Sequence, residues 1–241
     1  MNLVPTNGVL LLGSTSEIGI AILKRLKVAN GTQLILIGRN ADSIDLFQDW
    51  SGKVSFLPCD LSNVEQIRGV VSILRTNYVI DFAVIASAHL PPELLDSDFD
   101  SVHQTFSINA AGIASFLSSI ASMMSKSGGT LIYISTVAAM RPRIKNFTYG
   151  ASKRSIDFFI SGLAAKYKKD GLDIRVVRPG YVHTKLSKEF EVAPFATKPE
   201  NVAKDVISGL NRDRRILYSP RKLRLVMNAL RLLPSGIFHK L

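Results

Sequence analysis

Short apolar runs alternate along the chain with longer segments whose apolar residues recur at helical spacing. The apolar runs predict β-strands at Val9–Leu12, Gln33–Ile37, Val54–Leu57, Asp81–Ala86, Thr130–Ile134, Ile174–Val177 and Arg215–Tyr218. Several are apolar throughout, as expected of strands covered on both faces. The intervening segments predict helices near residues 17–28, 63–76, 99–126, 148–169 and 199–210. This alternation predicts an α/β fold: one doubly wound parallel sheet of about seven strands with helices on both faces.

The C-terminal residues 220–241 are expected to form a basic amphipathic tail on a domain of residues 1–219. A helix is predicted from Arg221 to Leu233, just before Pro234. One face carries Leu223, Val226, Met227, Leu230 and Leu233. The other face carries Arg221, Arg224, Asn228 and Arg231, with Leu225 and Leu232 among them. Such a helix can lie in an anionic membrane interface. Alternatively, its apolar face packs on the domain, which leaves the two leucines for a membrane, a partner subunit or a lipid tail.

Composition excludes a disordered chain, and charge points to an anionic partner. The chain has 241 residues, of which 46% are apolar, enough for a substantial core. The formal net charge of +11 is uneven: residues 1–125 carry 7 basic and 11 acidic side chains, and residues 126–241 carry 23 and 8. The C-terminal half is therefore expected to meet a nucleic acid, a membrane surface or a phosphorylated substrate.

The sequence favours a cytoplasmic location, or a peripheral one on the inner membrane face. No apolar run approaches the roughly 18 residues of a spanning helix, and no signal peptide is expected. The single cysteine, Cys59, excludes an intrachain disulfide and a cysteine-based zinc site. No metal is expected.

The turns after the first two strands indicate a dinucleotide site. The first strand runs into Gly13-Ser14-Thr15-Ser16-Glu17-Ile18-Gly19 and then an apolar helix. Backbone N–H groups at such a helix start attract a pyrophosphate, although the sharper GxGxxG pattern is absent and an ordinary turn is the alternative. The second strand ends at Arg39, which can accommodate the 2′-phosphate of NADP, whereas an acidic residue would bind the ribose of NAD. The sequence therefore favours NADP(H); NAD(H), with Arg39 as a solvated turn residue, is the alternative.

The most informative chemistry lies at Tyr149 and Lys153, which are four residues apart and share one helix face. A nearby ammonium favours the phenolate, so Lys153 is expected to lower the pKa of Tyr149 from about 10. Tyr149 would then donate a proton to the alkoxide that forms as hydride reaches a carbonyl. Ser135 ends the preceding strand, where its hydroxyl can bond the same carbonyl. Taken alone, the pair is also compatible with an ordinary surface contact.

The joint pattern resembles the short-chain dehydrogenase/reductase family, whose fold is of the Rossmann type. Gly13 and Gly19, Asp60, Asn109, Ser135, Tyr149 with Lys153, and Pro179-Gly180 follow in the family's order over nearly the whole chain. The resemblance implies that Tyr149 is the general acid, that Lys153 binds the nicotinamide ribose and tunes Tyr149, that Ser135 orients the carbonyl, and that Asn109 holds a relay water. It implies cofactor contacts at Gly13, Thr15, Ser16, Glu17, Ile18, Gly19, Arg39, Asp60, Leu61, Ala86, Tyr149, Lys153, Pro179, Gly180, Val182 and Thr184, with Asp60 at the adenine and Thr184 at the carboxamide.

Two segments depart from the family pattern along the expected cofactor groove. Leu12 and Glu17 replace the usual threonine and middle glycine of the first turn, and Ala86-Ser87-Ala88-His89 replaces Asn-Asn-Ala-Gly. A carboxylate beside a pyrophosphate is unfavourable, so the side chain of Glu17 is expected to point away from it. His89 is expected to be a loop residue rather than a catalytic group.

The loops after the fifth and sixth strands suggest a phosphate-bearing substrate, because they carry Arg141, Arg143, Lys145, Lys185 and Lys188. Basic loops that only aid solubility are the alternative. Within the family, residues 10–19, 146–150, 178–184 and 218–241 resemble reductases of a 2-keto-erythro-pentose carried on a polyprenyl phosphate. That resemblance implies a lipid-phosphate-linked keto sugar as substrate, a role in making an arabinan precursor for the cell wall, a flavin-dependent oxidase as partner and an anionic membrane surface.

Two other functional hypotheses stay open. One is a reductase of another lipid or small ketone, such as a 3-oxoacyl thioester or a sterol. The other is a catalytically inactive nucleotide-binding scaffold, which the intact Asn109, Ser135, Tyr149 and Lys153 disfavour. A nucleic-acid partner is not expected, since no recognition motif accompanies the charge. The family resemblance also allows a homo-oligomer.

Overall fold

Seven parallel strands form one sheet in a computed structural model that describes residues 4–92, 95–212, 214–232 and 234. The strands are β1 (Gly8–Leu12), β2 (Gln33–Gly38), β3 (Val54–Pro58), β4 (Phe82–Ile85), β5 (Gly129–Ile134), β6 (Leu172–Pro179) and β7 (Ile216–Ser219). Their order is β3-β2-β1-β4-β5-β6-β7, and every neighbouring pair is parallel. The predicted α/β Rossmann-type architecture is confirmed. The predicted strand Ile174–Val177 extends by two residues at each end to form β6.

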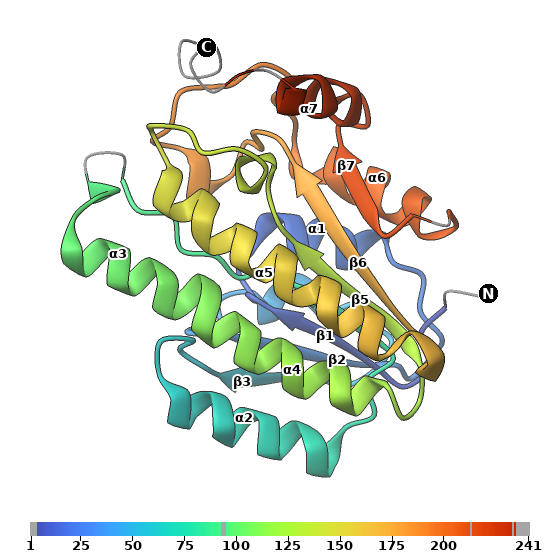
Figure 1. Cartoon of the computed structure of the whole chain (residues 1–241). Helices are drawn as coiled ribbons and strands as arrows, with labels where there is room; N and C mark the ends of the chain where they lie inside the picture. The colour runs from blue at the N-terminus through green and yellow to red at the C-terminus, as the bar shows by residue number, and fades with distance from the viewer. Residues whose placement is uncertain (1–3, 93–94, 213, 233, 235–241) are drawn as a thin grey trace.

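Helices cover both faces of the sheet (Figure 1). They are α1 (Glu17–Arg25), α2 (Val64–Asn77), α3 (Phe99–Phe106), α4 (Ile113–Met124), α5 (Phe147–Lys166), α6 (Pro199–Leu210) and α7 (Leu223–Leu232). Apolar side chains of α1 and α6 form one core against the sheet, and those of α2, α4 and α5 form the other. The inner strands therefore bury both faces, which explains why several strands are apolar throughout, whereas the edge strands β3 and β7 are only partly buried.

The predicted helix over residues 99–126 is interrupted. Between α3 and α4, residues Ser107–Gly112 form a π-helical segment, η3. Here Gly112 lies directly against the backbone carbonyl of Leu61, where a Cβ would collide. The interruption also places Asn109 fully buried beneath the loop that follows β4. Such π-helical insertions are frequent at functional sites.

Taken together, α3, η3 and α4 form the helical stretch Phe99–Met124, which is long and apolar enough, by length and composition, to cross a membrane. The stretch is not an unbroken apolar run, so the search for apolar runs in the sequence did not identify it as a possible membrane-spanning helix. Its α4 portion lies in the core, because Ile113, Phe116, Leu117 and Ile120 are fully buried against the sheet. The apolar character of this stretch is that of a core helix.

The tail helix α7 packs on the domain through its apolar face. Leu223 and Met227 are buried and share a cluster with Val137, while Leu225 and Leu232 remain 75% and 86% exposed. The Nη1 atom of Arg141 donates a hydrogen bond of 2.6 Å to the carbonyl oxygen of Leu230. Of the two expectations for this helix, packing on the domain is therefore what the structure shows. Leu233 and residues 235–241 of the expected tail lie outside the described residues.

Candidate active site

A cleft of about 1170 Å³ opens at the carboxyl end of the sheet. The strand order reverses between β1 and β4, and ligands of doubly wound sheets bind outside the strand ends at such a point. The turns after β1, β2, β3 and β4 line one part of the cleft, and the segments after β5 and β6 line the other. The topology thus brings residues from six separate strand ends to one cavity.

The turn after β1 approaches the loop after β4 closely. Gly13 has a φ of +91°, and a Cβ at this position would lie 2.7 Å from the backbone nitrogen of Ser87. Ser16 caps α1, its hydroxyl accepting a 3.3 Å hydrogen bond from the amide of Gly19. Gly19 itself does not line the cleft; it lets α1 pack against Leu11 of β1. The turn therefore opens a helix N-terminus toward the cavity, an arrangement that favours a bound phosphate.

Glu17 points away from the site expected for a pyrophosphate. Its Oε2 atom accepts a 2.7 Å hydrogen bond from the backbone amide of Lys185, in the 3₁₀ turn η6 (Lys185–Ser187). The carboxylate thus joins the turn after β1 to the loop after β6. This contact explains how an acidic residue is accommodated in the first turn.

The part of the cleft where adenosine is expected carries Arg39, Asp60, Leu61 and Ala86. Arg39 is exposed at the end of β2, where its guanidinium is available to a ligand. The Oδ1 atom of Asp60 accepts hydrogen bonds from the amide (2.8 Å) and hydroxyl (2.7 Å) of Ser62. These hydrogen bonds are the main cause that lowers the pKa of Asp60, and Arg39 adds to the effect.

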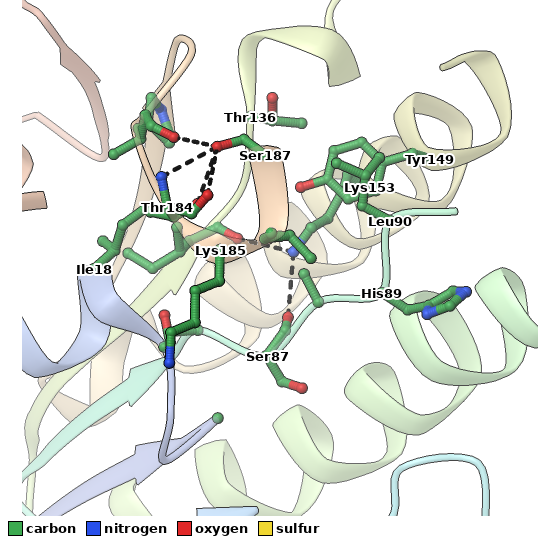
Figure 2. A pocket seen from close by; sticks show the side chains of 18 of the residues that line it. Ile18, Ser87, His89, Leu90, Thr136, Tyr149, Lys153, Thr184, Lys185 and Ser187 are labelled. Atoms are coloured by element: carbon green, nitrogen blue, oxygen red, sulfur yellow. Dashed lines mark hydrogen bonds between the residues drawn. The ribbon is translucent and has the colours of Figure 1, made fainter. Parts of the chain in front are cut away.

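Tyr149 and Lys153 stand one turn apart on α5 and face the same space (Figure 2). The Nζ atom of Lys153 lies 5.9 Å from the ring centroid of Tyr149. Lys153 is only 1% exposed to solvent. It donates hydrogen bonds to the carbonyl oxygens of Ile134 (3.0 Å) and Ser87 (3.4 Å). The strand end of β5 and the loop after β4 therefore hold the ammonium in place.

Burial dominates the acid–base properties of this pair. The pKa of Tyr149 is raised above its ordinary value, because the phenolate would be desolvated. The expected net lowering of the Tyr149 pKa is therefore wrong, because desolvation of the phenolate sets the direction of the shift. Burial also lowers the pKa of Lys153 from 10.5 to about 7, against the opposing effect of the Asp157 carboxylate. A lysine with this pKa carries only a partial charge near neutrality.

Ser135 and Asn109 are the other two members of the expected catalytic group, and only Ser135 lines the cleft. The hydroxyl of Ser135 is buried at the cleft wall and has no hydrogen-bond partner among the described residues. An orphaned buried hydroxyl in the cleft that Tyr149 also lines is suited to hold a substrate oxygen. The side chain of Asn109 does not line the cleft. It accepts from the amide of His89 (2.7 Å) and donates to its carbonyl (2.6 Å), which fixes the loop after β4.

The loop after β6 forms the wall opposite the first turn. Pro179, Gly180, Val182 and Thr184 all line the cleft. The hydroxyl of Ser187 lies 3.2 Å from the hydroxyl of Thr184 (Figure 2). It also accepts a 3.2 Å hydrogen bond from the backbone amide of Thr184. These contacts hold Thr184, the residue expected at the nicotinamide carboxamide.

The imidazole of His89, in the loop after β4, points away from Tyr149 in Figure 2, which agrees with the expected role of His89 as a loop residue.

The five expected substrate cations do not all reach the cleft. Arg143, Lys145 and Lys185 line it, and Lys145 forms an exposed ion pair with Glu191 at 3.3 Å. Arg141 and Lys188 do not line it. Arg141 reaches α7 instead, because that helix packs beside the loop after β5 and offers the carbonyl of Leu230. Packing of the tail thus redirects one of the predicted substrate residues.

Several contacts of the site escaped the sequence analysis. The carbonyls of Ile134 and Ser87 carry no side-chain signal at all, so only the fold reveals them. Asp157 follows Lys153 by four residues, a helical spacing that could have been noticed. Its Oδ2 atom lies 2.7 Å from Nη2 of Arg178, and both side chains are buried. The ring of Tyr133 lies 4.9 Å from the Lys153 nitrogen, and its hydroxyl has no partner among the described residues.

A family model described as short chain dehydrogenase matches residues 7–193. The chain therefore belongs to the short-chain dehydrogenase family. It is an oxidoreductase that acts on CH–OH or C=O groups with a nicotinamide cofactor. Tyr149, Lys153 and Ser135 lie inside the matched range, as do all the turns that line the dinucleotide side of the cleft.

Individual proteins resemble the chain over nearly its full length. An uncharacterized oxidoreductase of Streptomyces coelicolor is 31% identical over 98% of this chain and 96% of its own. An uncharacterized oxidoreductase of Mycobacterium tuberculosis is 28% identical over 97% of this chain and 96% of its own. Among solved structures, a short-chain dehydrogenase from Sphingobium yanoikuyae in complex with NADPH has a TM-score of 0.79 at 21% identity, covering 94% of this chain and 92% of that one.

The residues present fit a nicotinamide dinucleotide. The capped start of α1, the close-packed Gly13 and the exposed Arg39 suit its phosphates. The buried, unpartnered hydroxyl of Ser135 and the adjacent Tyr149 suit a carbonyl beside it.

Proposed function

We propose that this chain uses NADPH to reduce a keto group on a pentose carried by a polyprenyl phosphate. This is the reaction type of decaprenylphosphoryl-2-keto-β-D-erythro-pentose reductase, which helps to make an arabinan precursor of the cell wall. A flavin-dependent oxidase that produces the keto sugar would be the functional partner.

The composition of the cleft mouth carries the proposal. Arg143 and Lys185 line the mouth and form no ion pair with any described residue. Beside them, Ile144, Leu186 and Val192 line the same cleft and are 73%, 44% and 58% exposed. Unpaired cations suit a phosphate, and exposed apolar side chains suit a hydrocarbon chain. A phosphate-linked lipid combines both groups in one molecule.

The chain's own residues supply positioning and a proton. When bound, the nicotinamide cofactor would supply the hydride. The Ser135 hydroxyl would donate a hydrogen bond to the substrate carbonyl, and Tyr149 would deliver its proton to that oxygen. The raised pKa of Tyr149 keeps this proton on the phenol until a more basic alkoxide develops. Lys153, held by two backbone carbonyls, stabilises the negative charge left on Tyr149.

NADPH is the proposed cofactor because Arg39 is exposed at the end of β2 and lines the cleft. Arg39→Gln should lower kcat/KM for NADPH by about 10-fold and leave kcat/KM for NADH nearly unchanged. Lys24→Gln, an exposed cation on α1 outside the cleft, is the matched control. A wild-type preference for NADH would overturn this assignment.

The substrate is tested by following NADPH oxidation with three ketones: a polyprenyl-phosphate-linked keto pentose, the same sugar without its phosphate, and a 3-oxoacyl thioester. Tyr149→Phe should lower kcat by about 10²-fold or more on any true substrate, with NADPH binding retained. Arg143→Gln should raise KM for the phosphorylated lipid by about 10-fold. Lys188→Gln, a cation of the facing loop that does not line the cleft, should leave KM unchanged.

Equal kcat/KM with and without the phosphate would refute the phosphate-linked substrate. The second candidate, reduction of a 3-oxoacyl thioester or a sterol, is favoured by the exposed Ile144 and Val192 at the mouth. It predicts efficient turnover of those ketones and no effect of Arg143→Gln.

A further inference from the structure

A second, open groove of about 390 Å³ lies between the edge strand β7 and the helix α7. Arg178 and Tyr218 of the two outer strands line it, together with Arg214 and Arg215, which lead into β7. From α7 come Arg224, Asn228 and Arg231. Among the described residues that line the groove, five are arginines and none carries a carboxylate. We call this the arginine groove.

Four of these arginines are free to bind a ligand. Arg178 forms the floor, and its charge is matched by Asp157 at 2.7 Å. Arg214, Arg215, Arg224 and Arg231 are exposed, and none makes an ion pair with a described residue. Like charges held together raise the free energy of the ligand-free chain, and a bound anion relieves this repulsion. Planar guanidinium groups are also suited to phosphate oxygens.

Two exposed leucines identify the source of the phosphate. Leu225 and Leu232 directly follow Arg224 and Arg231 and lie on the adjacent exposed strip of α7. Leucines gain nothing from a nucleic-acid backbone, but they gain free energy by entering the apolar part of a lipid layer. Tyr218 is the one aromatic residue among the described residues that line the groove, and it is half-buried. The guanidinium carbon of Arg178 lies 6.0 Å from its ring centroid, so this cation already occupies a ring face on which a base would stack.

We infer that the arginine groove binds the phosphate headgroups of an anionic membrane while Leu225 and Leu232 enter its apolar layer.

The position of α7 gives membrane docking a consequence for the catalytic cleft. Arg231 lines the groove, and its neighbour Leu230 lines the cleft, so one helix separates the two. Figure 1 shows α7 at one end of the molecule, beside β7. Docking there would bring the cleft mouth, with its exposed apolar side chains, close to the lipid surface. The benefit of this orientation rests on the proposed lipid-linked substrate, whereas the docking does not.

The test compares binding of purified full-length variants to sedimenting vesicles of phosphatidylcholine with about 30% phosphatidylglycerol. The double variant Arg224→Gln/Arg231→Gln should bind about 30-fold more weakly than wild type, because each surface cation contributes about fivefold. The matched control is Lys168→Gln/Lys169→Gln, which removes the same charge from two exposed lysines. These lysines precede the amino end of β6, whereas the arginine groove lies at the carboxyl end of that strand. This control should lose less than about threefold. Leu225→Ser/Leu232→Ser should weaken binding while leaving the charge unchanged.

Four outcomes would overturn the inference. They are no binding of wild type to anionic vesicles, equal losses in the arginine and lysine variants, tighter binding of a single-stranded oligonucleotide than of vesicles, and release from vesicles by millimolar inorganic phosphate at constant ionic strength. The last of these would assign the groove to a free anion. Turnover of a water-soluble ketone by the arginine variant should match wild type and shows that this variant is folded. Failure of vesicle binding with turnover of the lipid-linked sugar intact would reject the docking and leave the proposed function standing.

Discussion

Replacing Lys153 with methionine should change how the stability of the ligand-free chain depends on pH. Lys153 is 1% exposed, and its nitrogen has two backbone carbonyls as hydrogen-bond acceptors. Desolvation lowers its pKa from 10.5 to about 7, although the Asp157 carboxylate opposes the shift. The folded chain therefore releases a proton that the unfolded chain keeps.

The sign and size of the effect follow from proton linkage. Between about pH 7 and pH 10.5 the unfolded chain binds more protons, so the free energy of unfolding rises with pH, by at most about 1.4 kcal/mol per pH unit. From about pH 7 to pH 9 the rise due to Lys153 is about 2 kcal/mol, and it is absent from Lys153→Met. Well below pH 7 both states are protonated, so the lysine adds no further pH dependence there.

Urea unfolding at three pH values between about 7 and 9 measures this directly. The free energy of unfolding of wild type minus that of Lys153→Met should increase by about 2 kcal/mol over this range. Lys168→Met, at an exposed lysine, is the control and should track wild type. A difference between wild type and Lys153→Met that stays constant with pH would refute the claim that burial shifts the titration of this lysine.

Three further changes test other parts of the structure. Asp157→Asn should lower the free energy of unfolding by about 3–5 kcal/mol, because it leaves the buried guanidinium of Arg178 unpaired; urea unfolding measures the loss, and one below about 1 kcal/mol would contradict the buried pair. Gly13→Ala should lower the free energy of unfolding by more than about 1 kcal/mol and weaken NADPH binding, because φ is +91° and the turn touches the loop after β4. An unchanged Tm would count against this backbone geometry. Glu17→Ala removes the acceptor of the Lys185 amide, so exchange of that amide with deuterium should accelerate several-fold, and unaltered exchange would show that the contact is not maintained in solution.

The placement of three candidate catalytic residues in one cleft was predictable because their spacing encodes their geometry. Four residues on a helix place Tyr149 and Lys153 on one face, and the end of a parallel strand brings Ser135 to the same cleft. Their electrostatic environment was not predictable. The lysine was expected to govern the pKa of Tyr149, but desolvation governs both groups. The extent of burial depends on how β5, α5 and the loop after β4 close around the pair, and no local pattern reports that.

The substrate side of the cleft was less predictable than the cofactor side. Arg141 and Lys188 belong to the expected loops, yet neither lines the cleft. Loop side chains take their direction from distant partners, and Arg141 takes its direction from the carbonyl of Leu230, 89 residues away in the chain. The acidic Glu17 shows the same effect, since its hydrogen-bond donor is 168 residues away.

The sequence by itself determined the strand and helix pattern, the parallel sheet, the dinucleotide turn and the tyrosine–lysine pair. Each of these depends on side chains close in sequence, where periodicity and spacing fix the geometry. The tertiary structure alone decided that the apolar face of α7 packs on the domain and which arginines meet across β7 and α7. It alone also decided which pKa values burial shifts. These properties arise from groups far apart in the chain that packing brings together, so their energies exist only in the folded molecule.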